Sequence, residues 1–141
     1  RKINHGSSRA ICIGKAAHGK PCHRTRRANR AEWCWFCAVF TRAVIKDFCN
    51  RVASFNLPMI AGILPVKSAK MAAHMNSNVP GINVPDDIIA KISSSDQVKI
   101  TSTEISAAII RDISPYCAGV HLMAIGWEAL IPAILEQAGV R

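Results

Sequence analysis

MIAGILPV at residues 59–66 decides the fold, because it runs directly into the helix-forming stretch KSAKMAAHM at residues 67–75. The arrangement returns near the end of the chain, where AGVHLMAIGW at 118–127 precedes EALIPAIL at 128–135. Each apolar run is short and continuous, as in a parallel strand that is buried on both faces. We therefore expect two strand–helix units of a parallel α/β architecture, in which functional residues lie at the carboxyl ends of the strands.

The sequence between these two units predicts a helical crossover. PDD at 85–87 favours a helix start, since proline suits the first helical position and acids suit the first turn. TSTE at 101–104 matches a capping box and predicts a helix that begins there and ends at Ser114-Pro115. The two apolar runs are then expected to be adjacent parallel strands.

Upstream, the pattern predicts further elements of the same kind. Residues 33–40 form an apolar run of strand length, and apolar positions at helical spacing cover 42–55 until Asn56-Leu57-Pro58. Residues 10–14 are a candidate strand, and residues 15–30 lack hydrophobic periodicity and are predicted to be loop.

The charge is distributed unevenly. The chain holds 18 Lys and Arg against 9 Asp and Glu, and residues 1–30 contain nine of the basic residues and none of the acids. We therefore divide the chain into a basic, divergent segment at 1–30 and a neutral domain at 31–141. The simplest interpretation of the basic segment is a solvated stretch without a binding role. The alternative is a surface that binds nucleic acid or phosphate.

The six cysteines are scattered, and no secretory signal precedes them. Cys12, Cys49 and Cys117 lie in apolar surroundings, where a cysteine is usually a buried free thiol, and this favours a reducing, cytoplasmic location. No apolar run approaches the roughly 18 residues of a membrane span, so no membrane association is expected. The chain also lacks an initiator Met, and we expect it to derive from a longer protein.

Several ordered motifs resemble methylenetetrahydrofolate reductase. They are AGILPVKSAKM at 61–71, NVPGI at 78–82, PDD at 85–87 and GVHLMAIGWE at 119–128, with a weaker match in ICIGKAAH at 11–18. The last strand is similar to that of the bacterial and archaeal branch of the family.

The resemblance covers about residues 38–140 and implies a partial (β/α)8 TIM barrel, roughly its last four strand–helix units. It further implies a flavin, FAD or FMN, and reduction of 5,10-methylenetetrahydrofolate to 5-methyltetrahydrofolate. NAD(P)H or another reduced donor would supply electrons, and an oligomer or an accessory electron-transfer subunit is consistent with the family. The family's general acid lies in the first half of the barrel, so we expect this chain to be inactive alone.

The sequence departs from the family pattern between residues 19 and 37. The interval 19–30 is about a dozen residues short, and Cys37 stands where the family has a glutamine that contacts folate. A thiol cannot reproduce the paired donor and acceptor of an amide. A frameshift, a deletion and true divergence would each explain this pattern.

The resemblance also assigns candidate site residues. Ala17, His18 and His23 fall near positions that face the flavin in the family. An ordinary loop location is the alternative for each of them, and no catalytic residue is identified.

Four further candidates follow the last two strands. Met71 and Met75 stand where many relatives have substrate-contacting Gln and Phe, and Met123 and Trp127 close the last strand. With Cys37, they are the candidate substrate-binding residues. Packing at the rim or in the core is the alternative for the methionines, and Trp127 could either stack on a planar ring or cap the barrel mouth.

The rival hypothesis is a basic, zinc-stabilised nucleic-acid-binding module, with Cys22, His23, Cys34 and Cys37 as ligands. However, Cys34 and Cys37 lie in an apolar, strand-like run in which alternation would direct them to opposite faces. No metal is therefore expected, and a nucleic-acid partner is disfavoured. A non-functional degenerate fragment is the third alternative.

Overall fold

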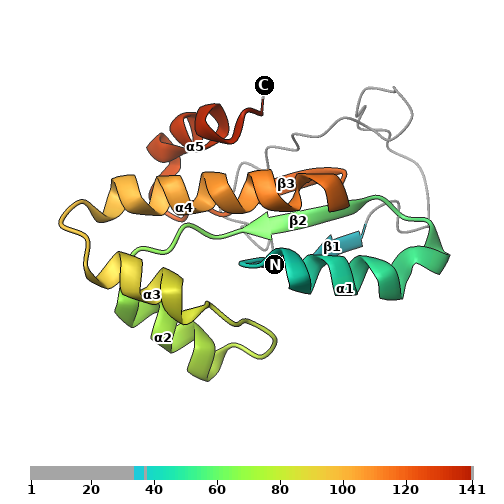
Figure 1. The fold of residues 1–141 in the computed structure, drawn as a ribbon, viewed down its shortest axis with the longest axis horizontal. Coiled ribbons are helices and arrows are strands. Elements are labelled where there is room, and N and C mark those ends of the chain that lie inside the picture. The colour runs from blue at the N-terminus through green and yellow to red at the C-terminus, as the bar shows by residue number, and fades with distance from the viewer. Residues whose placement is uncertain (1–33, 37, 141) are drawn as a thin grey trace, which may run out of the picture.

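The computed structural model describes residues 34–36 and 38–140, which form a small parallel sheet with helices packed along it (Figure 1). The three strands are β1 (Cys34–Phe36), β2 (Met59–Ile63) and β3 (Gly119–Leu122), in the order β1-β2-β3. All five residues of β2 are buried, as expected of a central parallel strand.

The pairing of β2 with β3 confirms the expected parallel arrangement of the two apolar runs. Ala61 is opposite Val120 and Ile63 is opposite Leu122, and the pairing is parallel. The residues between them form the helical crossover that a parallel connection requires. The mixed α/β class is thus confirmed, with an open three-stranded sheet among the described residues.

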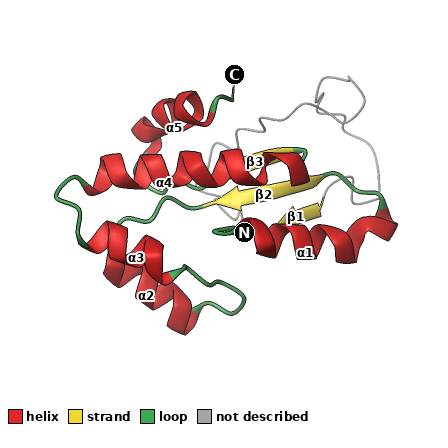
Figure 2. Cartoon of the chain, in the orientation of Figure 1, coloured by secondary structure: helices red, strands yellow, loops and turns green. Residues whose placement is uncertain are grey.

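Five α-helices accompany the strands among the described residues (Figure 2). Their bounds are α1 (Arg42–Val52), α2 (Ala69–Asn78), α3 (Asp86–Ser93), α4 (Val98–Ile113) and α5 (Ile131–Ala138). The starts of α2 and α3 agree with the sequence, since Ser68 caps α2 and two acids occupy the first turn of α3.

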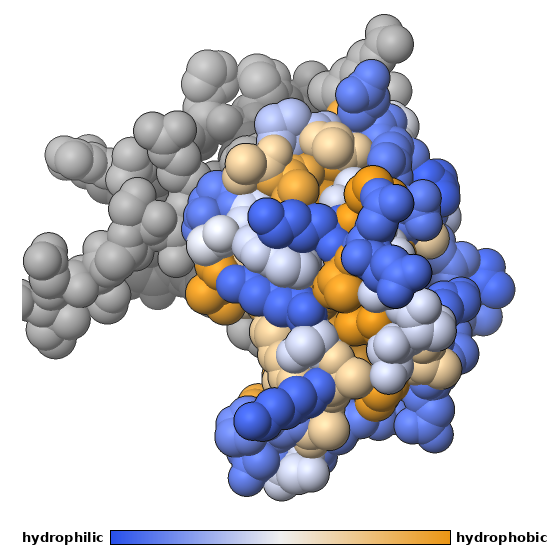
Figure 3. Space-filling model, turned by 90° about the vertical axis from the view of Figure 1, so that its left-hand side faces the viewer, coloured by the Kyte–Doolittle hydropathy of each residue, from blue (hydrophilic) through white to orange (hydrophobic). Residues whose placement is uncertain are grey.

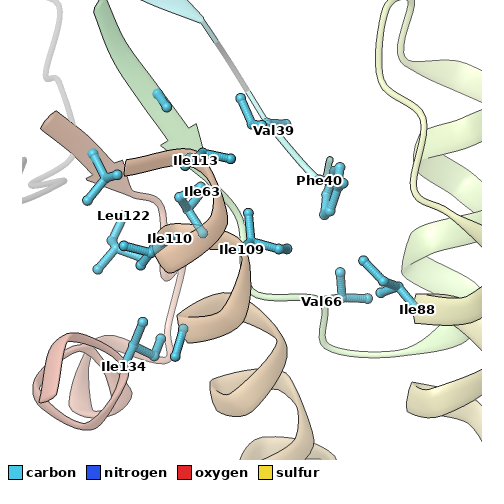
Figure 4. Close-up of a cluster of buried hydrophobic side chains, with 14 of the residues drawn as sticks. Val39, Phe40, Ile63, Val66, Ile88, Ile109, Ile110, Ile113, Leu122 and Ile134 are labelled. Atoms are coloured by element: carbon cyan, nitrogen blue, oxygen red, sulfur yellow. The ribbon is translucent and has the colours of Figure 1, made fainter. Parts of the chain in front are cut away.

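Helix α4 is central to the packing, because it contacts α1, α3 and α5. Its Ile110 and Ile113 lie close to Ile63 of β2 and Leu122 of β3, and Ile134 of α5 belongs to the same cluster (Figure 4). Phe40, Val66 and Ile88 extend the same cluster toward α3, at the end of β2. The core therefore joins the carboxyl ends of the strands to the crossover helices.

The capping-box prediction at 101–104 was wrong. Helix α4 begins three residues earlier, at Val98, and Thr101 lies inside it. The Ser95 hydroxyl accepts a hydrogen bond from the Gln97 amide at 3.1 Å and lies 2.6 Å from the Thr101 hydroxyl. This turn at Ser95 initiates the helix, so Thr101 interacts with the preceding turn instead of capping.

Two other expected elements are shorter than predicted. The 33–40 run is a strand only at Cys34–Phe36, and residues 38–40 continue without strand geometry. The helix expected over 42–55 ends at Val52 and is followed by a single 3-10 turn up to Asn56, whose φ is 49°. The candidate strand at 10–14 and the proposed boundary at 30–31 lie outside the described residues.

Candidate functional site

The carboxyl ends of the three strands meet at one edge of the sheet. Beyond β1, the Val39 amide donates to the Gly62 carbonyl at 2.8 Å. Beyond β3, the Met123 amide donates to the Ile63 carbonyl at 2.9 Å. These hydrogen bonds hold together the segments that leave the strands. In parallel α/β proteins, catalytic and binding residues lie at this edge of the sheet.

Figure 3 shows the side of the molecule toward which β2 points, where apolar surface lies between hydrophilic regions. Ile125, in the loop after β3, is a large hydrophobic residue that is 63% exposed. Apolar surface flanked by polar groups is typical of a face that receives a ligand or another part of a protein.

The backbone at this edge is strained. Ala38, just beyond β1, has a φ of 51°, and Ile125, just beyond β3, has a φ of 42°. A β-branched residue in the left-handed region is a genuine outlier, and such residues cluster at functional sites. Gly126 follows Ile125 at a φ of 82°, where the absence of Cβ makes the conformation acceptable.

Lys67, which leaves β2, reaches across to the loop after β3. Its ammonium group donates a hydrogen bond to the Ile125 carbonyl and lies 5.4 Å from the centre of the Trp127 ring. Both side chains are half-buried. The lysine therefore joins the two strand exits through a hydrogen bond and a cation–π contact.

Glu128 completes this cluster from the far side of the loop. Its Oε1 accepts a hydrogen bond from the Gly126 amide at 2.7 Å. That bond holds the pKa of the Glu128 carboxyl below its usual value, and the nearby charge of Lys67 lowers it further. Glu128 therefore remains ionised. It accepts a hydrogen bond from the turn at Ile125 and Gly126, which is the same turn that Lys67 contacts.

The four predicted residues after the last strands take different positions. Met123 and Trp127 are half-buried at the end of β3. Met71 is half-buried in the first turn of α2, whose cap forms when the Met71 amide donates to the Ser68 hydroxyl at 3.1 Å. Met75 is only 6% exposed and belongs to the hydrophobic core. Ligand contact by any of the four stays a prediction.

The remaining predicted residues lie outside the described residues. These are Ala17, His18 and His23, predicted to face the flavin, and Cys37, predicted to contact the substrate. Within 34–36 and 38–140, no group of three or more His, Cys, Asp or Glu is arranged to hold a metal. The proposed zinc ligands other than Cys34 are also outside that range.

Two cavities lie outside the cluster formed by Lys67, Trp127 and Glu128. One of about 820 Å³ lies between α1, α3 and α4, beside an ion pair between Arg42 and Asp112 at 3.5 Å. The other, of about 360 Å³, lies at the amino ends of β2 and β3 and includes Cys49 and Cys117. Neither contains the candidate site residues.

Comparison with known families decides the assignment. The model of the family described as methylenetetrahydrofolate reductase matches residues 39–139. The chain belongs to the methylenetetrahydrofolate reductase family. The resemblance inferred from the sequence motifs is thereby confirmed, and the match spans α1 through the end of α5. A comparison with curated proteins found no match.

Membership gives the chain a general biochemical class. The methylenetetrahydrofolate reductase family consists of oxidoreductases of folate-linked one-carbon metabolism that generally depend on a flavin, and it suggests a TIM barrel. The parallel order β1-β2-β3 is compatible with the later strands of that barrel. Among the described residues, none of the helices has the length and apolar character needed to cross a membrane.

Sequence inspection missed Lys67 as a residue of this edge. Lysine between a strand and a helix is ordinarily assigned to a solvated turn, and nothing in the local pattern indicates a partner 60 residues away. A signal was nevertheless present, because Lys67 and Trp127 each lie a few residues beyond one of two strands that were expected to be adjacent.

Proposed function

We propose that this chain supplies the later strand–helix units of a flavin-dependent methylenetetrahydrofolate reductase and is inactive by itself. The reaction is reduction of 5,10-methylenetetrahydrofolate to 5-methyltetrahydrofolate, with electrons from NAD(P)H or another reduced donor. The observation that carries the proposal is the family match over residues 39–139. The matched region contains a parallel sheet, and the loops after its strands include residues with positive φ.

The described residues suit one wall of a site for planar, partly apolar rings. Trp127 offers an aromatic surface, and the half-buried Met71 and Met123 offer polarizable thioethers. Both chemistries fit a flavin or a pterin ring. When bound, the flavin would supply hydride transfer to the folate; this wall would orient the rings and exclude water from one side.

Inactivity of the isolated chain follows from what a barrel site requires. A typical barrel has about 250 residues and builds its site from the loops of all eight strands, whereas this chain has 141 residues. The general acid expected in the first half contributes about 10²–10⁴-fold to such a reaction. Cys37 in place of the folate-contacting amide adds a further loss.

The proposal also covers the setting in which the chain works. We infer a cytoplasmic enzyme whose partners are the folate substrate and a reduced electron donor. An oligomer or an accessory electron-transfer subunit is also proposed.

The test uses two proteins: the chain alone, and the chain fused behind the first four strand–helix units of a complete family member. Each is mixed with excess FAD or FMN, desalted, and examined for a visible flavin band. Formation of 5-methyltetrahydrofolate is then measured with a chemical electron donor. We expect a flavin band and turnover from the fusion only.

The outcomes separate the parts of the proposal. Stoichiometric flavin and turnover in the chain alone would refute inactivity but support the reductase function. A fusion that unfolds cooperatively yet binds no flavin would refute the reductase function. Binding of one equivalent of zinc together with salt-sensitive DNA binding would favour the rival module.

A further inference from the structure

The loop 124–128 needs an external support. Ile125 adopts a φ of 42° although its side chain is 63% exposed, so no burial of that side chain compensates for the strain. A non-glycine residue in this region is strained and persists only where surrounding contacts hold it. The contacts that reach this loop therefore determine its conformation.

Lys67 provides such a contact from a different strand. Its ammonium group bonds the carbonyl of the strained residue itself and at the same time lies over the ring of Trp127. A Cβ built on Gly126 would lie 3.7 Å from the Lys67 Nζ, so the lysine also runs close beside the second left-handed residue. One side chain thus contacts Ile125 and Trp127 and lies beside Gly126 between them.

The contacts within the loop fix its turn but not its place. The Gly126 amide bonds Glu128, and the Trp127 amide bonds the Ala124 carbonyl at 3.2 Å. Both interactions are local; at the two sides of the turn, Ala124 lies in the hydrophobic core and the half-buried Trp127 packs against it. The Lys67 contacts cross from β2 to β3, so they can hold the turn, and the indole with it, at the sheet edge.

We propose that Lys67 is a positioning residue, which holds the strained 124–128 loop so that Trp127 presents its indole to the ring of the folate substrate. The substrate part of this inference rests on the proposed function. The structural part, that Lys67 holds the loop, is independent of it. Lys67 acts through Trp127 and is not itself a catalytic residue.

The experiment uses the full chain labelled with 5-fluorotryptophan. The ¹⁹F resonance of Trp127 is assigned by its loss in Trp127→Phe, since the other two tryptophans are Trp33 and Trp35. The variants are Lys67→Met, Lys67→Arg and the control Lys70→Met, which removes the same charge from an exposed position on α2. Urea unfolding checks that each variant is folded.

Lys67→Met is expected to shift or broaden the Trp127 resonance and to raise amide exchange at Gly126 and Trp127 about tenfold or more. Lys67→Arg should restore the wild-type values, because arginine can make both contacts. Lys70→Met should leave them unchanged. An unaltered resonance and exchange in folded Lys67→Met would overturn the structural part.

Because the chain alone is expected to carry only part of the site, the substrate part is tested by titrating the labelled fusion protein and its variants with millimolar 5-methyltetrahydrofolate, the Trp127 resonance again being assigned by its loss in Trp127→Phe. We expect the wild-type signal to move, with a Kd about tenfold weaker in Lys67→Met and unchanged in Lys70→Met. Equal Kd values in wild type and Lys67→Met would refute the positioning role while leaving the reductase function intact. Movement of no tryptophan signal in the wild type would refute substrate contact by Trp127, whereas the reductase function is judged separately by flavin binding and turnover of the fusion protein.

Discussion

The side-chain amide of Asn76 brackets the backbone of Val84 with two hydrogen bonds. Its Nδ2 donates to the Val84 carbonyl at 3.0 Å, and its Oδ1 accepts from the Val84 amide at 2.7 Å. Val84 is 1% exposed, so the pair fixes the loop between α2 and α3 and inserts the valine into the core.

Asn76→Ala is therefore expected to lower the free energy of unfolding by about 1–3 kcal/mol, because two backbone groups lose their partner. Urea unfolding followed by circular dichroism measures the change. The control is Asn78→Ala, whose exposed side chain bonds only His74 within the same helix, and which should cost about 0.5 kcal/mol or less. Equal effects of the two changes would contradict the role of Asn76.

Two isoleucines of α4 give a matched test of the core. Ile110 is 1% exposed and Ile100 is 53% exposed. Ile110→Ala should lower the free energy of unfolding by about 2–5 kcal/mol through lost burial and a cavity, whereas Ile100→Ala should change it by about 0.5 kcal/mol or less. If Ile110→Ala behaved like the exposed control, α4 would not pack as described.

Relief of strain at Ile125 should stabilise the chain. Ile125→Gly removes the Cβ that makes a φ of 42° costly, whereas Ile125→Ala removes most of the side chain but keeps that Cβ. We expect the glycine variant to be about 1 kcal/mol more stable than the alanine variant in urea unfolding. A glycine variant of equal or lower stability would show that the left-handed conformation carries no strain.

Cys117 makes stability depend on pH in the alkaline range. Burial raises the pKa of its thiol from 9.0 to about 11, and the neighbouring Cys49 adds to the shift. Because the folded state holds the proton more tightly, this stabilisation is complete below about pH 9 and declines as the pH rises toward about 11.

The measurement compares the wild type with Cys117→Ala at pH 7.5, 9 and 10. The difference between their free energies of unfolding should be constant up to about pH 9. Above that pH, the wild type should lose stability relative to Cys117→Ala. Tyrosine and lysine titrations affect both proteins alike and cancel in the difference. A difference that stayed constant to pH 10 would mean that the thiol is not shifted.

Part of this protein is determined by local sequence. The apolar runs at 59–65 and 118–124 predicted β2 and β3 because a buried parallel strand needs continuous hydrophobicity over a few residues. The acids at 86–87 and Ser114-Pro115 predicted helix ends, since helix-dipole and proline effects act within one turn. The family motifs, which are likewise contiguous, predicted the match over 39–139.

Other features were decided by contacts between distant residues. The start of α4 was mispredicted because Ser95 and Thr101 interact across a turn that the capping pattern does not include. The half-buried state of Cys49 and Cys117, which the sequence predicted to be buried, depends on how α1 meets the entrance of β3. Asn76 and Val84 are paired only because the α2–α3 loop folds back.

The edge of the sheet combines both kinds of information. The sequence placed Trp127 after β3 and Lys67 after β2, but their contact required the two strands to lie side by side in register. The positive φ of Ile125 is equally invisible in the sequence, since isoleucine disfavours that conformation and only the surrounding contacts impose it. Local patterns therefore determined which elements form, and the tertiary structure decided which side chains meet, because side chains far apart in sequence interact only after the backbone has brought them together.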